Sequence, residues 1–188
     1  MKCYKKLNLL EDKKMIIKLN VWSIPLMLVL GLIFTILAIQ IRPNDFADFS
    51  IYFLILFMGV YFLLLIIHEL IHGFFFKRFE PKNRVKFGFK NGMAYATSPG
   101  SIYPKSQFLV IVLAPFFVIT TVLFTLFLVK AIAPLTFIFL ASVHGAGCIG
   151  DFYFAFLLSK LPQDVHVEDT EVGIDFYFPV DSPFWLDK

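Results

Sequence analysis

Four long apolar blocks constrain this chain more than any other feature of its sequence. They cover residues 21–41, 51–76, 108–129 and 134–158. A helix needs about 20 mainly apolar residues to cross a bilayer, and each block is long enough. Hydrophobic residues make up 59% of the chain and charged residues only 16%, which disfavours a water-soluble globule. The blocks predict an all-α polytopic membrane protein with four transmembrane helices.

Basic residues are concentrated in two of the segments outside these blocks. Residues 1–20 hold six lysines and residues 77–106 hold seven lysines and arginines, whereas residues 42–50 and 130–133 hold one basic residue each. Segments rich in Lys and Arg stay on the cytoplasmic side of a membrane. The pattern predicts a multi-pass protein of the cell membrane with both termini in the cytoplasm. Topology and lipid headgroups account for these charges, and no feature indicates nucleic-acid binding.

The two ends of the chain differ in charge. Residues 1–20 predict a basic cytoplasmic segment, residues 21–158 the four-span core, and residues 159–188 an acidic cytoplasmic tail. Partial alternation of apolar and polar residues in VHVEDTEVGIDFYFPV predicts a short strand or hairpin in the tail. Cys3 and Cys148 form no disulfide framework, and we expect no cleavable signal peptide before the first block.

The second block contains His68, Glu69 and His72 in the sequence HELIH. Residues at i and i+4 lie on one face of a helix, so the two imidazoles can bind one zinc ion. Glu69 then lies where it can take a proton from zinc-bound water. The competing interpretation is a pair of core histidines bonded to neighbouring helices. A charged side chain at the bilayer centre costs about 2.5–3.5 kcal/mol on insertion scales, and polar groups kept there are usually functional, which favours zinc binding.

A catalytic zinc ion usually has three protein ligands and one open position. No third histidine follows His72 at the spacing of the long HExxHxxGxxH motif, and the later glutamates all lie in loop or tail. Asp151 is the one carboxylate left in an apolar block. His68 lies nine residues before Lys77, and Asp151 lies nine residues before Lys160. Both lysines follow their apolar blocks, so the two side chains lie at a similar depth. We expect Asp151 to be the third ligand; the alternative is a carboxylate paired with a histidine without metal.

Three glycines lie just before Asp151, at positions 145, 147 and 150. They predict either close helix packing or local unwinding that lets Asp151 reach the metal. His144 lies seven residues before Asp151, about 10 Å away in a regular helix, which is too far for the same zinc ion. His144 is either a packed histidine that supports a ligand or a group that stabilises an oxyanion or bonds the substrate. We expect Cys148 to be a small packing residue rather than a ligand.

These residues carry a resemblance to a known group of enzymes. HELIH and the late Gly-Asp pair resemble the site-2 protease clan of intramembrane zinc proteases. The chain is more similar to short bacterial membrane proteins described as putative zincin peptidases. Their pattern is matched here by His68–Gly73, the basic segment Val85–Pro99, Ala114-Pro115 and Gly150-Asp151. The likeness covers about residues 50 to 178.

The resemblance implies four site residues, the zinc ligands His68, His72 and Asp151 and the general base Glu69. It also implies a membrane-associated β-hairpin after the HExxH helix, at about residues 84–98, where Asn91-Gly92 is a hairpin turn signal. An edge of that hairpin would hold a substrate segment in extended form. The clan's N-P-x-D-G sequence around the aspartate is absent here, and so are PDZ and CBS domains.

The sequence therefore predicts an intramembrane zinc metallopeptidase whose substrate is a membrane protein or peptide. Zinc-activated water, with Glu69 as base, would hydrolyse peptide bonds in or near the bilayer. Two alternatives stay open: a non-enzymatic zinc-binding membrane protein, such as an immunity or chaperone-like factor, and a zinc-dependent hydrolase of a lipid or another amide. The intact Glu69 argues against the first, because a structural zinc site needs no base.

Overall fold

The computed structural model describes residues 1–9, 11–45, 51–90 and 93–185. The chain divides into two compact units. Unit 1 consists of Met1–Lys18, Glu69–Ala114 and Asp151–Lys188, and unit 2 consists of Leu19–His68 and Pro115–Gly150.

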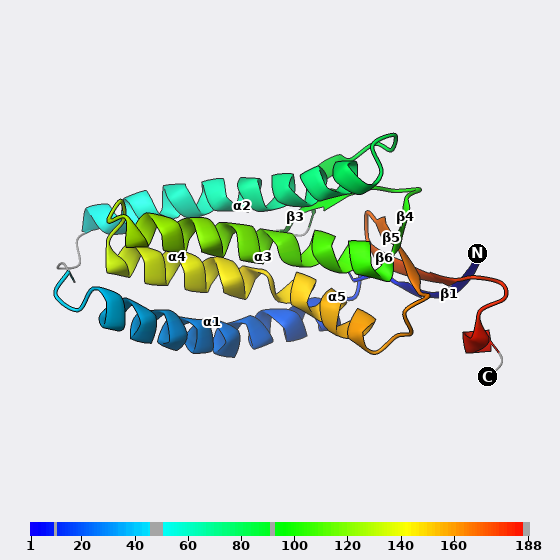
Figure 1. Cartoon of the computed structure of the whole chain (residues 1–188), viewed down its shortest axis with the longest axis horizontal. Coiled ribbons are helices and arrows are strands. Elements are labelled where there is room, and N and C mark those ends of the chain that lie inside the picture. The colour runs from blue at the N-terminus through cyan, green and yellow to red at the C-terminus, as the bar shows by residue number, and fades with distance from the viewer. Residues whose placement is uncertain (10, 46–50, 91–92, 186–188) are drawn as a thin grey trace. The chain divides into compact units, whose positions relative to one another are not determined.

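Helices supply most of the described residues (Figure 1). They are α1 (Lys13–Ile41), α2 (Ile51–Phe79), α3 (Lys105–Leu128), α4 (Pro134–Gly147) and α5 (Ile149–Ser159). Among the described residues, α1, α2 and α3 are each long and apolar enough to cross a membrane, and α4 with α5 passes that test as a bent pair. The first three apolar blocks form helices as expected. The fourth block, expected as a span over residues 134–158 with packing or local unwinding at its glycines, forms two helices with a break between them.

The interruption in the fourth block falls at Cys148. The backbone of this residue, with φ −72° and ψ 10°, leaves the helix, although its N–H still donates to the His144 carbonyl at 3.1 Å. Glycines at positions 145, 147 and 150 flank it, and each glycine weakens a helix by about 0.5–1 kcal/mol relative to alanine. Pro134, by contrast, favours the start of α4, because its ring fixes a helical φ at the first position of the helix.

α1 exposes a large apolar surface. Only Phe34 and Ala38 of this helix are buried. Eleven large apolar side chains are at least 39% exposed: Ile17, Val21, Trp22, Ile24, Leu28, Val29, Leu32, Ile33, Ile36, Ile39 and Ile41. Soluble monomers rarely expose contiguous apolar patches of this extent, so the surface of α1 is compatible with contact to lipid.

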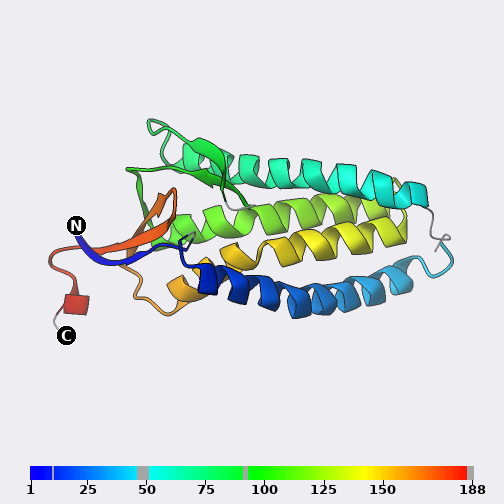
Figure 2. The same cartoon turned by 180° about the vertical axis from the view of Figure 1, so that it is seen from behind.

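In unit 2, α1, the first part of α2, the second part of α3, and α4 lie lengthwise beside one another (Figures 1 and 2). Phe137 of α4 is fully buried among them, with ring centroids 5.3 Å from Phe34 and 4.9 Å from Phe127. Gly145 permits the close approach of α4, because a Cβ there would lie 2.6 Å from Cδ1 of Leu30. Glycine at this position therefore serves helix packing.

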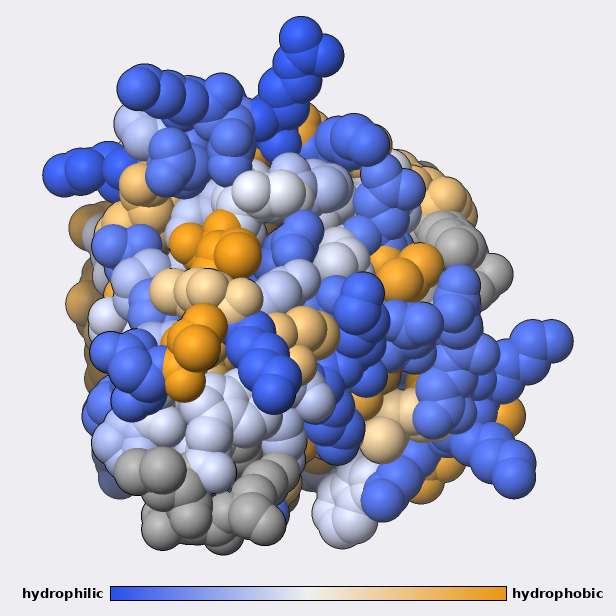
Figure 3. Space-filling view, turned by 90° about the vertical axis from the view of Figure 1, so that its right-hand side faces the viewer, coloured by the Kyte–Doolittle hydropathy of each residue, from blue (hydrophilic) through white to orange (hydrophobic). Residues whose placement is uncertain are grey.

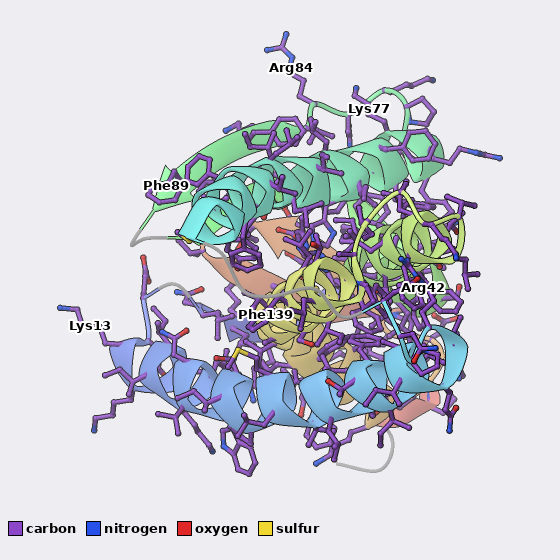
Figure 4. The ribbon with its side chains drawn as sticks, turned by 90° about the vertical axis from the view of Figure 1, so that its left-hand side faces the viewer. Lys13, Arg42, Lys77, Arg84, Phe89 and Phe139 are labelled. Carbon is purple, nitrogen blue, oxygen red and sulfur yellow. The ribbon has the colours of Figure 1, made fainter. Side chains whose placement is uncertain are left out.

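Arg42 joins the end of α1 to the connection between α3 and α4 (Figure 4). Its Nη1 donates to the carbonyls of Phe127 at 2.8 Å and Ile132 at 3.0 Å, and its Nε donates to Asp45 at 2.7 Å. The last carbonyls of a helix have no partner within it. The guanidinium group therefore gives a donor to one carbonyl in the last turn of α3 and to one in the connection after it.

Unit 1 contains a four-stranded antiparallel sheet that the sequence analysis did not predict. Its strands, in spatial order, are β1 (Lys2–Leu7), β6 (Gly173–Phe178), β5 (His166–Thr170) and β4 (Ile102–Pro104). The β5–β6 hairpin agrees with the alternation seen in the tail, but its partners come from the N-terminus and from the segment before α3. The expected all-α class is therefore incomplete, because small sheets accompany the helices.

One face of this sheet packs on the first half of α3. Val167, Ile174, Phe176 and Phe178 are buried in one cluster with residues of α3 that include Phe108 and Ile111. The strand-bearing face of unit 1 is largely hydrophilic at its surface (Figure 3). The tail strands are thus part of the core of unit 1 and not a loose appendage.

A two-stranded sheet follows α2, as expected. β2 (Lys86–Lys90) pairs antiparallel with β3 (Met93–Thr97). The expected turn at Asn91-Gly92 lies outside the described residues. Phe89 of β2 is 73% exposed and points outward (Figure 4). The hairpin therefore presents an apolar side chain at its surface.

Candidate metal centre

α2 carries the HELIH sequence without interruption. His72 is buried and His68 and Glu69 are half-buried, whereas Ile66, Leu70 and Phe74 are at least 50% exposed. The exposed residues follow one another at four-residue spacing, so they line one side of the helix. The two histidines, also four residues apart, lie on another side, turned away from the surface.

His72 faces Asp151 within unit 1. Its Nε2 lies 3.4 Å from Oδ1 of Asp151, and its Nδ1 lies 2.9 Å from the carbonyl oxygen of Ile111. A carbonyl oxygen can only accept, so Nδ1 carries the proton and donates it to Ile111. In neutral His72 this leaves the lone pair of Nε2 directed at the carboxylate.

Two acceptors that face each other need a cation or a proton between them. In a tetrahedral zinc site with bonds of about 2.0–2.2 Å to nitrogen and oxygen, neighbouring ligand atoms lie about 3.3–3.5 Å apart. The separation of 3.4 Å between His72 and Asp151 matches one edge of that tetrahedron. The hydrogen bond from His72 to Ile111 is the kind of outer contact that fixes the ring of a metal-binding histidine. These residues therefore fit a zinc ion.

His68 is in contact with His144 and Cys148 within unit 2. Nδ1 of His68 lies 3.2 Å from Nε2 of His144, and Sγ of Cys148 lies 3.9 Å from each of these nitrogens. His144 and Cys148 are buried. These three residues form a second group that could hold a metal ion. The sequence alone predicted a packing role for Cys148, although its position four residues after His144 indicated that the two residues share one face of the helix.

Gly73, the last residue of HELIHG, lies against the hairpin. A Cβ at this position would lie 2.5 Å from Cζ of Phe87, in β2, and 3.5 Å from Cγ1 of Val85. Glycine therefore lets α2 and β2 approach each other one residue after His72. This contact fixes the hairpin beside the HExxH turn.

Asp169 of β5 is a site-proximal carboxylate that the sequence analysis did not single out. Burial raises its pKa to about 7, partly offset by a hydrogen bond from Thr97 and by His72, and reinforced by the charges of Asp151 and Glu69. Thr97 also donates to the Asp169 carbonyl at 3.0 Å. The sequence predicted an acidic tail with strand character, but it indicated no role for any acidic residue of the tail.

The sequence-predicted residues thus fall into two groups that both draw on α2. His72 and Asp151 meet in unit 1, which also contains Glu69. His68 meets His144 in unit 2.

A scan against protein-family models matches residues 61–166, which is more than half of the chain, to the family described as "Putative zincin peptidase". The chain belongs to this family. The matched segment contains every residue of both groups. Zincins are zinc peptidases, so the zincin peptidase family implies zinc at the site. No curated protein and no solved structure matches the chain.

Proposed function

We propose that this zincin peptidase is an intramembrane zinc metallopeptidase of the site-2 protease type. His68, His72 and Asp151 would hold the zinc ion. The observation that carries the proposal is the distance of 3.4 Å between His72 and Asp151, with the imidazole oriented by the carbonyl of Ile111. His72 lies three residues after Glu69 on the same helix.

Each residue has a defined task in peptide hydrolysis. When bound, zinc acidifies water and polarises the scissile carbonyl. The Glu69 carboxylate accepts the proton of the attacking water and then returns it to the leaving amine, so it acts as base and then as acid. Ile111 holds the ring of His72 through Nδ1. His144 does the same for His68 by accepting a hydrogen bond from Nδ1, which leaves Nε2 of His68 as the ligand.

The setting of the reaction is the cell membrane. The three long helices and the α4–α5 pair are apolar enough to cross it, and the exposed side chains of α1 suit lipid. The basic residues in 1–20 and 77–106 support a topology with both termini in the cytoplasm.

The substrate is a membrane protein or peptide in our proposal. The β2–β3 hairpin follows the HExxH helix directly and packs on Gly73. Among the described residues, each strand of this sheet pairs with one other strand, and an extended peptide can bind the outer edge of a strand through main-chain hydrogen bonds. The hairpin would therefore present a substrate segment near Glu69.

The test compares wild-type protein with Glu69→Gln in purified form and in membranes. We expect both to contain about one zinc ion per chain at the hydrolytic ligands, and only the wild type to generate new peptide termini in a proteomic comparison. Glu80→Gln, at an exposed position just after α2, is the matched control and should behave as wild type. Full cleavage by Glu69→Gln would exclude Glu69 as the base. Retained biological function in that variant, with loss in His68→Ala, would favour a non-enzymatic zinc protein.

A further inference from the structure

We propose that His68, His144 and Cys148 form a second metal-binding set, for zinc or a similar borderline cation, that competes with the hydrolytic set for His68. The metal set itself is independent of the proposed peptidase activity. Only its consequence for catalysis rests on that function.

The three ligand atoms already stand at the distances that a metal requires. With bonds of about 2.0–2.1 Å to nitrogen and 2.3 Å to sulfur, a tetrahedral zinc ion separates two nitrogens by about 3.4 Å and a nitrogen from a sulfur by about 3.6 Å. The observed separations are 3.2 Å between the two nitrogens and 3.9 Å from the sulfur to each of them. Each of the three distances between ligand atoms therefore lies within a few tenths of an ångström of the value for a tetrahedral zinc site.

The chemistry of the set favours a borderline or soft cation. A thiolate with two imidazoles is a donor set that suits zinc or copper, whereas magnesium and calcium take oxygen ligands. Cys148 is fully buried and His144 is 2% exposed. A thiolate in such a place is costly on its own, and a bound cation supplies the charge that compensates it. Packing alone would explain the burial of Cys148, but not a sulfur equidistant from two ring nitrogens.

The backbone holds the set in place before any metal arrives. Cys148 donates its N–H to the His144 carbonyl, and its Sγ lies 3.3 Å from the same oxygen. The two side chains therefore share the C-terminal turn of α4. Gly145 brings that turn close to Leu30 of α1, and α2 supplies His68 as the third member.

His68 cannot serve both sets at once while it is neutral. A neutral imidazole has one lone pair, and its other nitrogen carries a proton. The atom of His68 that faces His144 and Cys148 is Nδ1. If Nδ1 binds a metal, the proton moves to Nε2, which then cannot be the hydrolytic ligand. A metal in the second set therefore holds the peptidase in an inactive form.

Cobalt(II) tests the set directly, because a thiolate ligand gives cobalt a charge-transfer band in the near ultraviolet. The full-length Asp151→Asn variant is loaded with cobalt, since this change weakens the hydrolytic set without touching the second one. We expect the band in this variant and its complete loss when Cys148→Ser is added. Cys3→Ser, at an exposed position in β1, is the matched control and should keep the band.

Three results would overturn the proposal. They are folded Asp151→Asn protein that binds no cobalt, cobalt bound without the band, and a band that survives Cys148→Ser. If Asp151→Asn does not fold, X-ray absorption of the zinc-loaded His72→Ala variant replaces it, because this change also weakens the hydrolytic set. A sulfur shell at about 2.3 Å then supports the second set, and its absence refutes it. Cleavage assays of Glu69→Gln do not enter this test, so either proposal can fail alone.

Discussion

His72 directs Nε2 at Asp151 and anchors Nδ1 on the carbonyl of Ile111, so both ring nitrogens have an assigned partner within unit 1. The first contact joins α2 to the start of α5, and the second joins α2 to α3. The imidazole is therefore fixed from two directions, as a metal ligand must be for its lone pair to meet the cation.

In a Cys148→Ser background, which removes the second metal-binding set, Asp151→Asn should lower the zinc content of the purified protein at least tenfold at limiting zinc. The amide keeps the size of the carboxylate but lacks the negative charge that a zinc ligand supplies at 3.4 Å from His72. Elemental analysis of dialysed protein measures the effect. Asp181→Asn, at an exposed position in the tail, is the control and should retain zinc. An Asp151→Asn protein with full zinc content and unchanged zinc affinity would remove Asp151 from the ligand set.

Gly173→Ala should destabilise unit 1 by about 1–3 kcal/mol, the usual cost of overpacking. A Cβ at this position would lie 1.9 Å from the carbonyl oxygen of Leu7 and 2.8 Å from the amide nitrogen of Leu9. Backbone atoms of β1 cannot rotate away as a side chain can, so the pairing of β1 with β6 must shift. Hydrogen exchange of the β1 amides should become faster and the thermal midpoint should fall.

The control for this glycine is Gly59→Ala in α2, where a Cβ meets nothing within 4 Å. That change should leave the exchange of the β1 amides as in the wild type. Equal β1 protection in wild type and Gly173→Ala would contradict the predicted contact between these strands.

Asp169 should contribute stability to the metal-free protein that is lost as the pH rises from about 4 to about 7, and Asp169→Asn should remove this contribution. Burial raises the pKa of Asp169 from 3.8 to about 7. Between these values the unfolded chain loses the Asp169 proton while the folded chain keeps it, so unfolding is favoured increasingly. Above the folded pKa the contribution is constant. Thermal midpoints of both proteins in detergent give the difference, and identical pH profiles would refute the assignment.

Arg42→Ala should destabilise unit 2 by about 1.5–3 kcal/mol, the range for hydrogen bonds made by a charged group. The carbonyls of Phe127 and Ile132 both lose the hydrogen bond from the guanidinium, and the Phe127 carbonyl keeps the N–H of Lys130 at 3.1 Å. Arg42→Lys should recover only part of the loss, because an ammonium group lacks the forked geometry of guanidinium. Lys130→Gln is the control, since Lys130 is 71% exposed and 3.9 Å from Asp45, and such a pair contributes about 0–1 kcal/mol. A thermal unfolding midpoint for Arg42→Ala equal to that of Lys130→Gln would show that the hydrogen bonds of Arg42 do not contribute to stability.

The pairing of β1 with β6 and the break between α4 and α5 could not be predicted from local sequence patterns. β1 and β6 stand at opposite ends of the chain, and no period within Lys2–Leu7 indicates the pairing of Leu7 with Ile174. The glycines around Cys148 were compatible with packing or with unwinding. The structure has both, with Gly145 packed on Leu30 and the helix interrupted three residues later.

The sequence by itself determined the apolar helices, the HExxH turn and the hairpin after it, because apolar length, a four-residue spacing and an alternating strand pattern are properties of neighbouring residues. Only the tertiary structure decided that Asp151 faces His72, that Cys148 stands beside His68, and that the tail strands join the core of unit 1, with Asp169 half-buried in β5. Those relationships join residues dozens of positions apart. They depend on how side chains from different helices and strands fill one space, which no local pattern records.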